Sequence, residues 1–105
     1  MNLERINPAE LGRPSGFSHA VSVPAGRLVF LAGQLATGRG GQPADLVSLT
    51  IYLIDVEDYQ AHGRQIGAVW RRLAGTEYPA MAGVGVTRLW DPEALVELQG
   101  IAAVG

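Results

Sequence analysis

The stretch VSLTIYLI at Val47–Ile54 is apolar at most positions and alternates poorly between apolar and polar side chains. A strand with one solvated face alternates clearly, so this pattern is typical of a central strand that is buried on both faces. Asp55 follows directly and suits the N-cap position of a helix, with Asp58 in the first turn. The sequence therefore predicts a buried strand that passes at once into a helix.

Apolar and aromatic side chains then recur at three- and four-residue spacing, which predicts one helix that ends at Gly75. These positions are Tyr59, His62, Ile66, Val69, Trp70 and Leu73. Gly63 and Gly67 lie one turn apart on the same helix. Each costs about 1 kcal/mol of helix stability relative to alanine. We therefore expect the two glycines to permit a close backbone approach.

Strands are predicted on both sides of this unit. Ala20–Val23 and Leu28–Ala36 read as a hairpin around the turn at 24–26. Pro79–Trp90 and Ala94–Val104 read as two further strands, with turn residues between them. The order is then two strands, a connection, a strand, a helix and two strands. This order predicts an α+β fold with a helix on one face of a sheet.

Two other stretches are predicted to lack regular structure. The first fifteen or so residues are polar and interrupted by proline, and we expect them to lie across the surface as an arm. TGRGGQPADL at 37–46 is a glycine-rich connection. Its Gly38–Gly41 segment lacks the Gly-Lys-Ser/Thr ending of a phosphate-binding loop and does not open a helix, so a flexible loop is expected there.

The length and composition exclude several classes of protein. A chain of 105 residues fits a single domain. Its residues are 48% hydrophobic and 17% charged, and so small a domain cannot bury all of this apolar surface, which favours an oligomer. The net charge of −2 offers no footprint for nucleic acid. The chain has no cysteine and no lysine, which excludes disulfides, thiolate metal sites and Schiff-base catalysis. With neither a signal-peptide pattern nor a membrane-spanning run, a cytoplasmic protein without membrane attachment is expected.

Glu97 interrupts the apolar run ALVELQGI near the end of the chain. In a strand, Glu97 and Gln99 share one face, while Val96 and Leu98 point to the other. One interpretation is an ordinary solvated glutamate on an exposed or edge surface. The other is a carboxylate in a cleft, where desolvation favours its protonated form and suits it to exchange protons with water.

The remaining polar and aromatic side chains carry less information. His19 and His62 are too few for a metal site, which usually needs three or more ligands, so no metal is expected. Ser18 and His19 are neighbours in an extended segment and point to opposite faces, which excludes a catalytic pair. Trp90, in a turn, suits either the rim of a pocket or an oligomer contact.

Four stretches together resemble the RidA/YjgF family. They are SGFSHAV (15–21), LVFLAGQLA (28–36), YPAMAGVGV (78–86) and ALVELQGIA (94–102). Family members carry Gly-Pro-Tyr-Ser near the start, Ser-Gly-Gln at the end of a strand, Pro-Ala-Arg at the start of the penultimate strand, and Val-Glu-Ile-Glu-Ala-Ile-Ala in the last. The resemblance spans nearly the whole chain. It implies a chorismate-mutase-like α+β fold, a homotrimer, and ligand-binding clefts between subunits.

The resemblance also implies an activity, namely hydrolysis of reactive enamines and imines to keto acids and ammonia without metal or organic cofactor. Glu97 falls on the family glutamate that is thought to position and activate the attacking water. Gly33 and Gln34 match the family glycine and glutamine. On this resemblance, Glu97 is the candidate catalytic residue, and Gly33 and Gln34 are candidate ligand-binding residues.

Other family positions differ, and they are also candidate ligand-binding positions. The arginine that clamps the substrate carboxylate falls on Met81, and the tyrosine near the start falls on Phe17. The serine before Gly-Gln is Ala32, the helix asparagine aligns with Gly63, and a frequent cysteine is Gly83. A bidentate arginine–carboxylate pair is stronger than a single charge-assisted hydrogen bond of roughly 1.5–3 kcal/mol. We therefore expect a ligand that is less anionic than an imino acid.

The connection at Thr37–Leu46 is also short for the family, which has a loop and a long helix there. A parallel crossover needs a dozen or more residues, and only about ten are available. Either the protein lacks a helix between Thr37 and Gly41, or a flexible segment is absent from this sequence. The second explanation is favoured, because an uncovered apolar sheet face invites aggregation.

The sequence thus leads to a RidA-like homotrimer that binds a small, weakly polar metabolite near Glu97. The alternative is an enamine or imine deaminase of altered specificity. RNA cleavage has been attached to the family, but it is disfavoured here because the chain is acidic and has no basic patch with interleaved aromatics. A structural subunit with an empty cleft is the remaining alternative.

Overall fold

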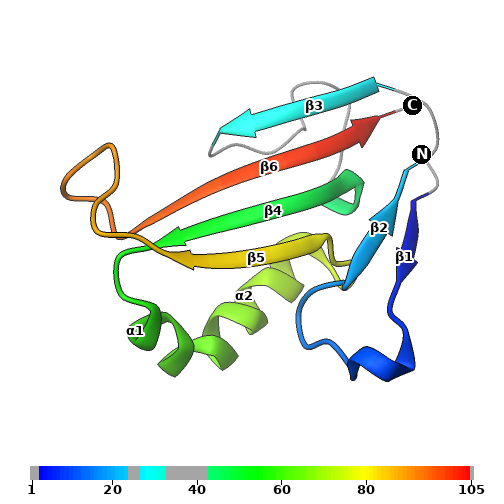
Figure 1. The fold of residues 1–105 in the computed structure, drawn as a ribbon, viewed down its shortest axis with the longest axis horizontal. Helices are drawn as coiled ribbons and strands as arrows, with labels where there is room; N and C mark the ends of the chain where they lie inside the picture. Colours follow the sequence, from blue (N-terminus) through cyan, green and yellow to red (C-terminus); the bar gives the residue numbers. More distant parts are fainter. Residues whose placement is uncertain (1–2, 24–26, 33–42, 105) are drawn as a thin grey trace.

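The computed structural model describes residues 3–23, 27–32 and 43–104, and within these residues two β-sheets and two α-helices form (Figure 1). The strands are β1 (Glu4–Ile6), β2 (Ala20–Ser22), β3 (Arg27–Ala32), β4 (Leu46–Leu53), β5 (Ala80–Gly85) and β6 (Val96–Val104). The α-helices are α1 (Val56–Ala61) and α2 (Gly63–Ala74), and two short 3-10 helices are η1 (Ala9–Leu11) and η3 (Pro43–Asp45).

The larger sheet has the strand order β3-β6-β4-β5. Strand β6 runs antiparallel to both β3 and β4, whereas β5 runs parallel to β4. The prediction of a central strand is confirmed, because β4 lies between β6 and β5. Only one of its faces is fully buried, however, since Leu49, Ile51 and Leu53 are buried and the residues between them are half-buried.

The helix cap was predicted correctly, and the helix length was not. A carboxylate oxygen of Asp55 accepts a hydrogen bond from the backbone N–H of Asp58 at 3.0 Å. The predicted single helix is divided at His62, whose φ of −107° and ψ of 18° are not helical. The His62 ring nitrogen Nδ1 lies 2.8 Å from the Asp58 carbonyl oxygen, which a continuous helix would use for its own ladder. Gly75, at a φ of 83°, ends α2 as expected.

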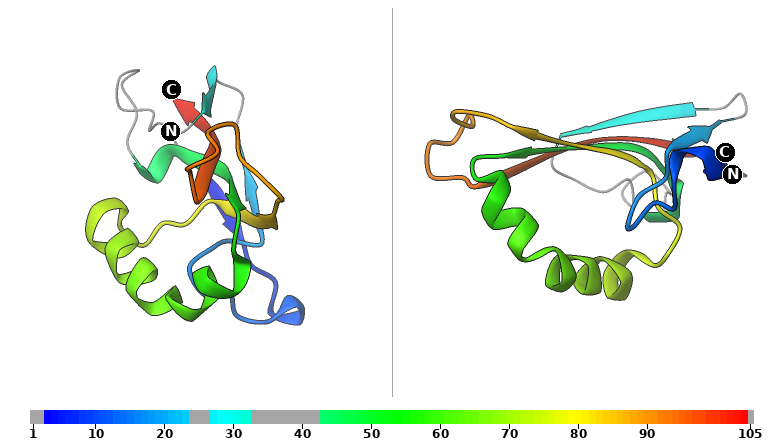
Figure 2. Two further views of the ribbon diagram at one scale, coloured as in Figure 1. Left: turned by 90° about the vertical axis from the view of Figure 1, so that its left-hand side faces the viewer. Right: turned by 60° about the horizontal axis from the view of Figure 1, so that its bottom comes forward.

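The helices cover one face of the larger sheet, and Figure 2 shows both of them on the same side of it. The indole of Trp70 on α2 packs against two groups of buried side chains. One group is Leu46 and Ala102, and the other is Leu49, Ile51 and Leu53. Because these groups come from β4 and β6, Trp70 joins the helix layer to both central strands.

The opposite face of the larger sheet keeps apolar side chains exposed. Phe30 on β3 is 74% exposed, Leu28 is 49% exposed and Val84 on β5 is 40% exposed. The strand register places these residues on the face away from the helices, because Phe30 pairs with Ile101 and Val84 with Tyr52. We call this surface the open sheet face. Exposed apolar surface of this kind is typical of an interaction site.

The predicted hairpin is wrong. Strand β2 pairs with β1 in a separate two-stranded sheet, and β3 pairs with β6. The expected turn at 24–26 and the strand end at 33–36 lie outside the described residues. The predicted N-terminal arm also contains β1 and η1. Three-residue strands of this kind carry no alternation pattern, and they form because a partner strand is available rather than from local preference.

Three further expectations need correction. The strand predicted to reach Trp90 ends at Gly85, and Trp90 is 92% exposed in the connection to β6. Asp91 and Pro92 favour a turn in this connection rather than a strand. Gly63 and Gly67 make no close backbone approach, because a Cβ on Gly63 would meet nothing within 4 Å and one on Gly67 would meet only a flexible arginine side chain at 3.5 Å.

No helix in the described ranges is long and apolar enough to cross a membrane.

Candidate functional site

Glu97 lies on β6, directly opposite Tyr52 on the antiparallel strand β4. Gln99 lies opposite Thr50 in the same register. Residues that face each other across an antiparallel pair project to the same side, so all four side chains lie on the open sheet face. The prediction that Glu97 and Gln99 share a face is therefore confirmed. Glu97 is exposed in the single chain.

A hydrogen bond orders the neighbourhood of Glu97. The Tyr52 hydroxyl donates to Oε1 of Gln99 at 3.0 Å. This bond fixes an amide and a phenol beside the carboxylate of Glu97, and together they offer donors and acceptors to a polar ligand or a water molecule. Sequence reasoning did not single out Tyr52, because its position in a largely apolar strand gave no sign that its hydroxyl faces outward.

Met81 lies on the other side of the sheet from Glu97. It pairs with Leu49 across the parallel strands β4 and β5, and its side chain packs against the cluster of Leu49, Ile51 and Leu53 under the helices. Gly83 pairs with Ile51 and faces the same way. One chain therefore does not bring Met81 together with Glu97. A site that contains both positions must take one of them from each of two chains.

The other candidate positions are divided between the sheet and the helix layer. Ala32 is the last residue of β3, and its backbone lies opposite Gln99 on β6. Gly33 and Gln34 lie outside the described residues, as do residues 37–42, where a flexible loop or a family helix was expected. The end of this connection is described and forms η3 (Pro43–Asp45), although the whole of 37–46 was expected to lack regular structure. Gly63 begins α2 and is exposed. Among the described positions that the resemblance assigns to one site, only Ala32 is directly cross-strand from the polar group around Glu97.

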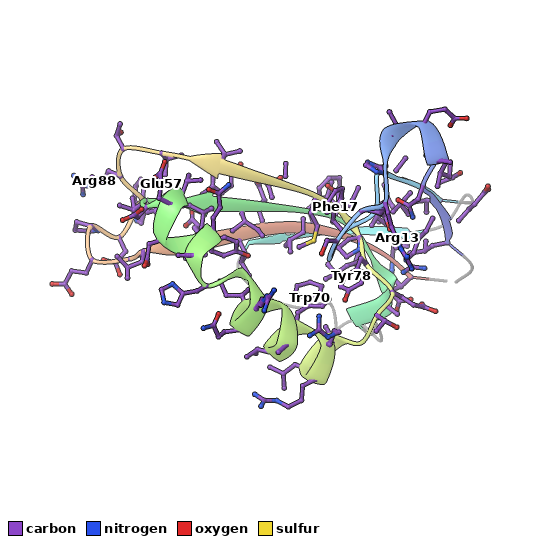
Figure 3. All side chains as sticks on the ribbon, turned by 90° about the horizontal axis from the view of Figure 1, so that it is seen from below. Arg13, Phe17, Glu57, Trp70, Tyr78 and Arg88 are labelled. Carbon is purple, nitrogen blue, oxygen red and sulfur yellow. The ribbon has the colours of Figure 1, made fainter. Side chains whose placement is uncertain are left out.

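Phe17 lines an open cavity of about 570 Å³ at the N-terminal end of the fold, which we call the N-terminal cavity. Its walls come from the N-terminal segment and from the approach to β5, and Figure 3 shows Arg13, Phe17 and Tyr78 gathered at this end of the sheet. The lining residues are Arg5, Asn7, Ala9, Gly12, Arg13, Pro14, Phe17, Ser18, Thr76 and Tyr78. Of these, sequence reasoning singled out only Phe17 as a site residue.

Hydrogen bonds from Ser18 hold Phe17 against the start of β5. The Ser18 backbone N–H donates to the Pro79 carbonyl at 2.9 Å, and its hydroxyl donates to the Tyr78 carbonyl at 2.8 Å. Ser18 also forms a parallel bridge with Ala80, which in turn pairs with Ser48 on β4. Tyr52, opposite Glu97, lies four residues further along β4, or about 13 Å. The N-terminal cavity and Glu97 are thus separate in one chain.

Within the part of the chain that the structure describes, no three histidine or carboxylate side chains gather in a way that could hold a metal ion. His19 and His62 lie in different parts of the fold. Nε2 of His19 lies 3.1 Å from the Gly12 carbonyl oxygen in the N-terminal segment, whereas His62 lies at the junction of the helices beside Asp58. Both histidines therefore have local structural contacts.

Comparison with known proteins gives the family of this chain. The family model described as Endoribonuclease L-PSP matches residues 37–104. No curated protein matches the chain. Among solved structures, YyfB from Yersinia pestis, a protein of the Rid family, is 30% identical, with a TM-score of 0.80 over 99% of this chain and 100% of that one. This coverage means that the family includes a member of about the same length.

Two structures from Escherichia coli share the fold at lower identity. YjgF is 19% identical, with a TM-score of 0.64 over 94% of each chain. TdcF, solved with bound serine, is 18% identical, with a TM-score of 0.64 over 90% of this chain and 92% of that one. The expected α+β fold of the RidA type is confirmed by these matches. On the extent of the family match and the identity to YyfB, the chain belongs to the Endoribonuclease L-PSP family, which includes the Rid and YjgF proteins.

Proposed function

We propose that this protein is a RidA-like homotrimer whose clefts, formed between copies, bind a small and weakly polar metabolite near Glu97. The observation that carries the proposal is the placement of Glu97 and Met81 on opposite faces of one sheet. Because the resemblance assigns both positions to a single site, that site needs two chains. The exposed Phe30 and Leu28 beside this polar group supply apolar surface for an interface between copies.

The expected polarity of the ligand rests on Met81. The family arginine would pair with a carboxylate, but the Met81 side chain packs against Leu49, Ile51 and Leu53 and offers no charge. The bound serine in TdcF supports a small-molecule site on this fold. A ligand of this protein would then be similar in size to an amino acid and would carry no carboxylate that depends on position 81.

If the cleft is catalytic, Glu97 is the general base that removes a proton from an attacking water. The Tyr52–Gln99 hydrogen bond holds a polar wall beside it. A second chain over the open sheet face would exclude bulk water and strengthen these polar interactions. This geometry supports the alternative function, an enamine or imine deaminase of altered specificity that releases ammonia.

The experiment is an assay of keto-acid and ammonia release from freshly generated amino-acid imines. Wild type, Met81→Arg, Met81→Gln and Met81→Arg combined with Glu97→Gln are compared. We expect wild type and Met81→Gln to be inert and Met81→Arg to gain at least tenfold, which corresponds to about 1.4 kcal/mol of transition-state stabilisation. Adding Glu97→Gln should abolish the gain. Wild-type activity on these imines would contradict the proposed ligand class and support the deaminase alternative.

The assembly is tested separately by light scattering coupled to size-exclusion chromatography. We expect the mass of three 11.1 kDa chains. Replacing Phe30 on the open sheet face by glutamate should shift the mass toward that of one chain, because it places a charge in the proposed interface. The matched control is Leu73→Glu on the exposed side of α2, where the side chain is 70% exposed. A monomeric wild type would contradict the proposal.

RNA cleavage, which the family description names, is not proposed for this chain. Its net charge is −2, and RNA-binding proteins usually carry a basic surface. Salt-dependent retention of single-stranded RNA on a filter would contradict this interpretation.

A further inference from the structure

The helix layer leaves apolar surface uncovered on its own side of the sheet. On β6, Val96 lies opposite Leu53 and therefore on the face that the helices cover. Leu98 lies opposite Ile51 on the same face. Both Val96 and Leu98 are nevertheless exposed, and no residue of α1 or α2 is fully buried. The two helices form a single row along the sheet (Figure 2), and this row does not seal the apolar surface beside it.

Two open cavities follow this row of helices. One, of about 320 Å³, lies between α1 and the start of β6, and its walls include Tyr59 and Val96. The other, of about 450 Å³, runs along α2, where Val69 and Leu73 line it. Ile66 lines both cavities, so they meet at this side chain. We call the two cavities together the helix groove.

The dimensions of the helix groove fit a short helix. From Tyr59 to Leu73 the helices rise by about 21 Å, which is the length of about 14 helical residues. A small metabolite would fill only part of this length. The strand that lines the groove, β6, is paired on both sides by β3 and β4, so it has no free edge to which another strand could add. An α-helix therefore fits the groove better than a strand or a metabolite.

The end of the helix groove beside α1 is acidic. Asp55 and Asp58 line the cavity there, and Glu57 is exposed in the same turn. His62 lies close to this group, with its Nδ1 at 3.4 Å from a carboxylate oxygen of Asp58, but it is charged only when protonated. This end of the groove therefore favours a cation.

The other end of the helix groove is basic. Helix α2 contains three arginines and no acidic residue, and Arg71 and Arg72 lie in its last turn. Their side chains make no hydrogen bond or ion pair within the part of the chain that the structure describes. Arg72 comes three residues after Val69, so it lies beside the apolar wall of the groove. This end therefore favours an anion.

We propose that the helix groove binds an amphipathic α-helix of a partner protein. The bound helix lies antiparallel to α2, with acidic side chains in its first turn beside Arg72 and basic side chains in its last turn beside Asp58. Its apolar side chains fill the two cavities. The antiparallel arrangement also places the positive dipole end of the bound helix beside the negative end of α2. This interaction goes beyond the function proposed for Glu97, because it uses the other face of the sheet and requires no turnover.

A synthetic peptide of about 14 residues tests the proposal. The probe has leucines at three- and four-residue spacing, glutamates in its first turn, lysines in its last turn and no tryptophan. A peptide of the same composition without the helical spacing of leucines is the control. Trp90→Phe is the protein background, because it leaves Trp70 in the groove as the single tryptophan of the chain. We expect the probe, and not the control peptide, to shift the Trp70 emission to shorter wavelength in a saturable titration.

Two substitutions in this background separate the apolar contribution from the electrostatic one. Leu73→Glu should weaken binding of the probe by at least about tenfold, because it places a charge in the apolar contact. Arg72→Glu should weaken it by at least about threefold at low salt, and high salt should reduce this difference. The matched control is Arg88→Glu, an exposed arginine outside both cavities, which should bind as the background does. Circular dichroism checks that each variant keeps the fold.

Four results would overturn the proposal. No binding of the probe, or equal affinity for both peptides, would exclude an amphipathic helix as the ligand. Equal affinity of Leu73→Glu and the background would place the peptide elsewhere. Association of the protein alone beyond three chains, reversed by Leu73→Glu, would assign the groove to a second copy. Binding to phosphatidylglycerol vesicles without binding of the probe would assign it to a membrane surface. A monomeric wild type would contradict the proposed homotrimer and leave the peptide titration unaffected.

Discussion

The Tyr52 hydroxyl on β4 and the Gln99 side chain on β6 are joined by a hydrogen bond of 3.0 Å across the open sheet face. The two residues are diagonal neighbours, because Tyr52 is directly opposite Glu97 and Gln99 is directly opposite Thr50. The bond thus links the two polar neighbours of the candidate catalytic carboxylate, Tyr52 across the strand pair and Gln99 two residues further along β6. It makes the polar group around Glu97 a defined structure rather than a set of independent solvated side chains.

A double-mutant cycle with Tyr52→Phe and Gln99→Ala should detect this bond. We expect a coupling free energy of about 0.5–1 kcal/mol, because the bond is exposed and its partners can exchange it for water. Urea unfolding of the wild type, both single variants and the double variant gives the value. Strictly additive effects on the free energy of unfolding would show that the two side chains do not interact in solution.

Two glycines on β5 should respond oppositely to alanine. A Cβ on Gly85 would lie 3.0 Å from Cγ2 of Val56 at the start of α1, whereas a Cβ on Gly83 would lie 3.9 Å from Cδ1 of Leu53. Because valine is stiff at χ1, Gly85→Ala must displace the start of α1, and we expect a loss of about 1 kcal/mol. Gly83→Ala should be neutral or stabilise the protein by up to about 1 kcal/mol.

Urea unfolding of the two glycine variants provides the comparison, with each serving as the control for the other. Equal stability of Gly85→Ala and Gly83→Ala would mean that the start of α1 yields without cost.

Arg5 should contribute far more to stability than its ion-pair partner. Its guanidinium donates to two backbone carbonyls, and its side chain is 20% exposed, whereas the Glu77 side chain is 64% exposed. Arg5→Gln removes a charged donor and leaves the two carbonyl oxygens without this partner, so it should destabilise the fold by about 2–3 kcal/mol. Glu77→Gln should cost less than about 0.5 kcal/mol.

Thermal and urea unfolding of the Arg5 and Glu77 variants measure this difference. A large effect of Glu77→Gln would assign the stability to the ion pair instead of the carbonyl contacts. Comparable losses for Arg5→Gln and Arg5→Lys would show that the extended guanidinium is needed to reach both carbonyls.

The parts of the fold that sequence could predict are those with a local signal. The apolar run of β4, the Asp55 cap and the Gly75 stop each act within a few residues, and all three were located correctly. The Glu97 face was also predictable, because strand alternation alone decides it. Family resemblance supplied the overall architecture, which the solved Rid and YjgF structures confirm.

The missed features depend on partners that are distant in the sequence. Nothing local in ERI at Glu4–Ile6 shows that β2 will accept it as a neighbour, and without that pairing β2 and β3 look like a hairpin. The N-terminal cavity likewise joins residues 5–18 to residues 76–78. The assignment of Phe17 and Met81 to a ligand site is still a prediction, and so is the explanation of the short connection at Thr37–Leu46.

Tyr59 on α1 should make stability depend on pH in the alkaline range. Burial raises the pKa of its phenol above the ordinary 10.0, because desolvation disfavours the phenolate. Above pH 10 the unfolded chain therefore loses this proton more readily than the folded one, and stability falls as pH rises toward the folded pKa. Tyr59→Phe should flatten this decline in urea unfolding between pH 8 and 11, with Tyr52→Phe on the opposite face as the control. An unchanged slope in Tyr59→Phe would place the alkaline response elsewhere.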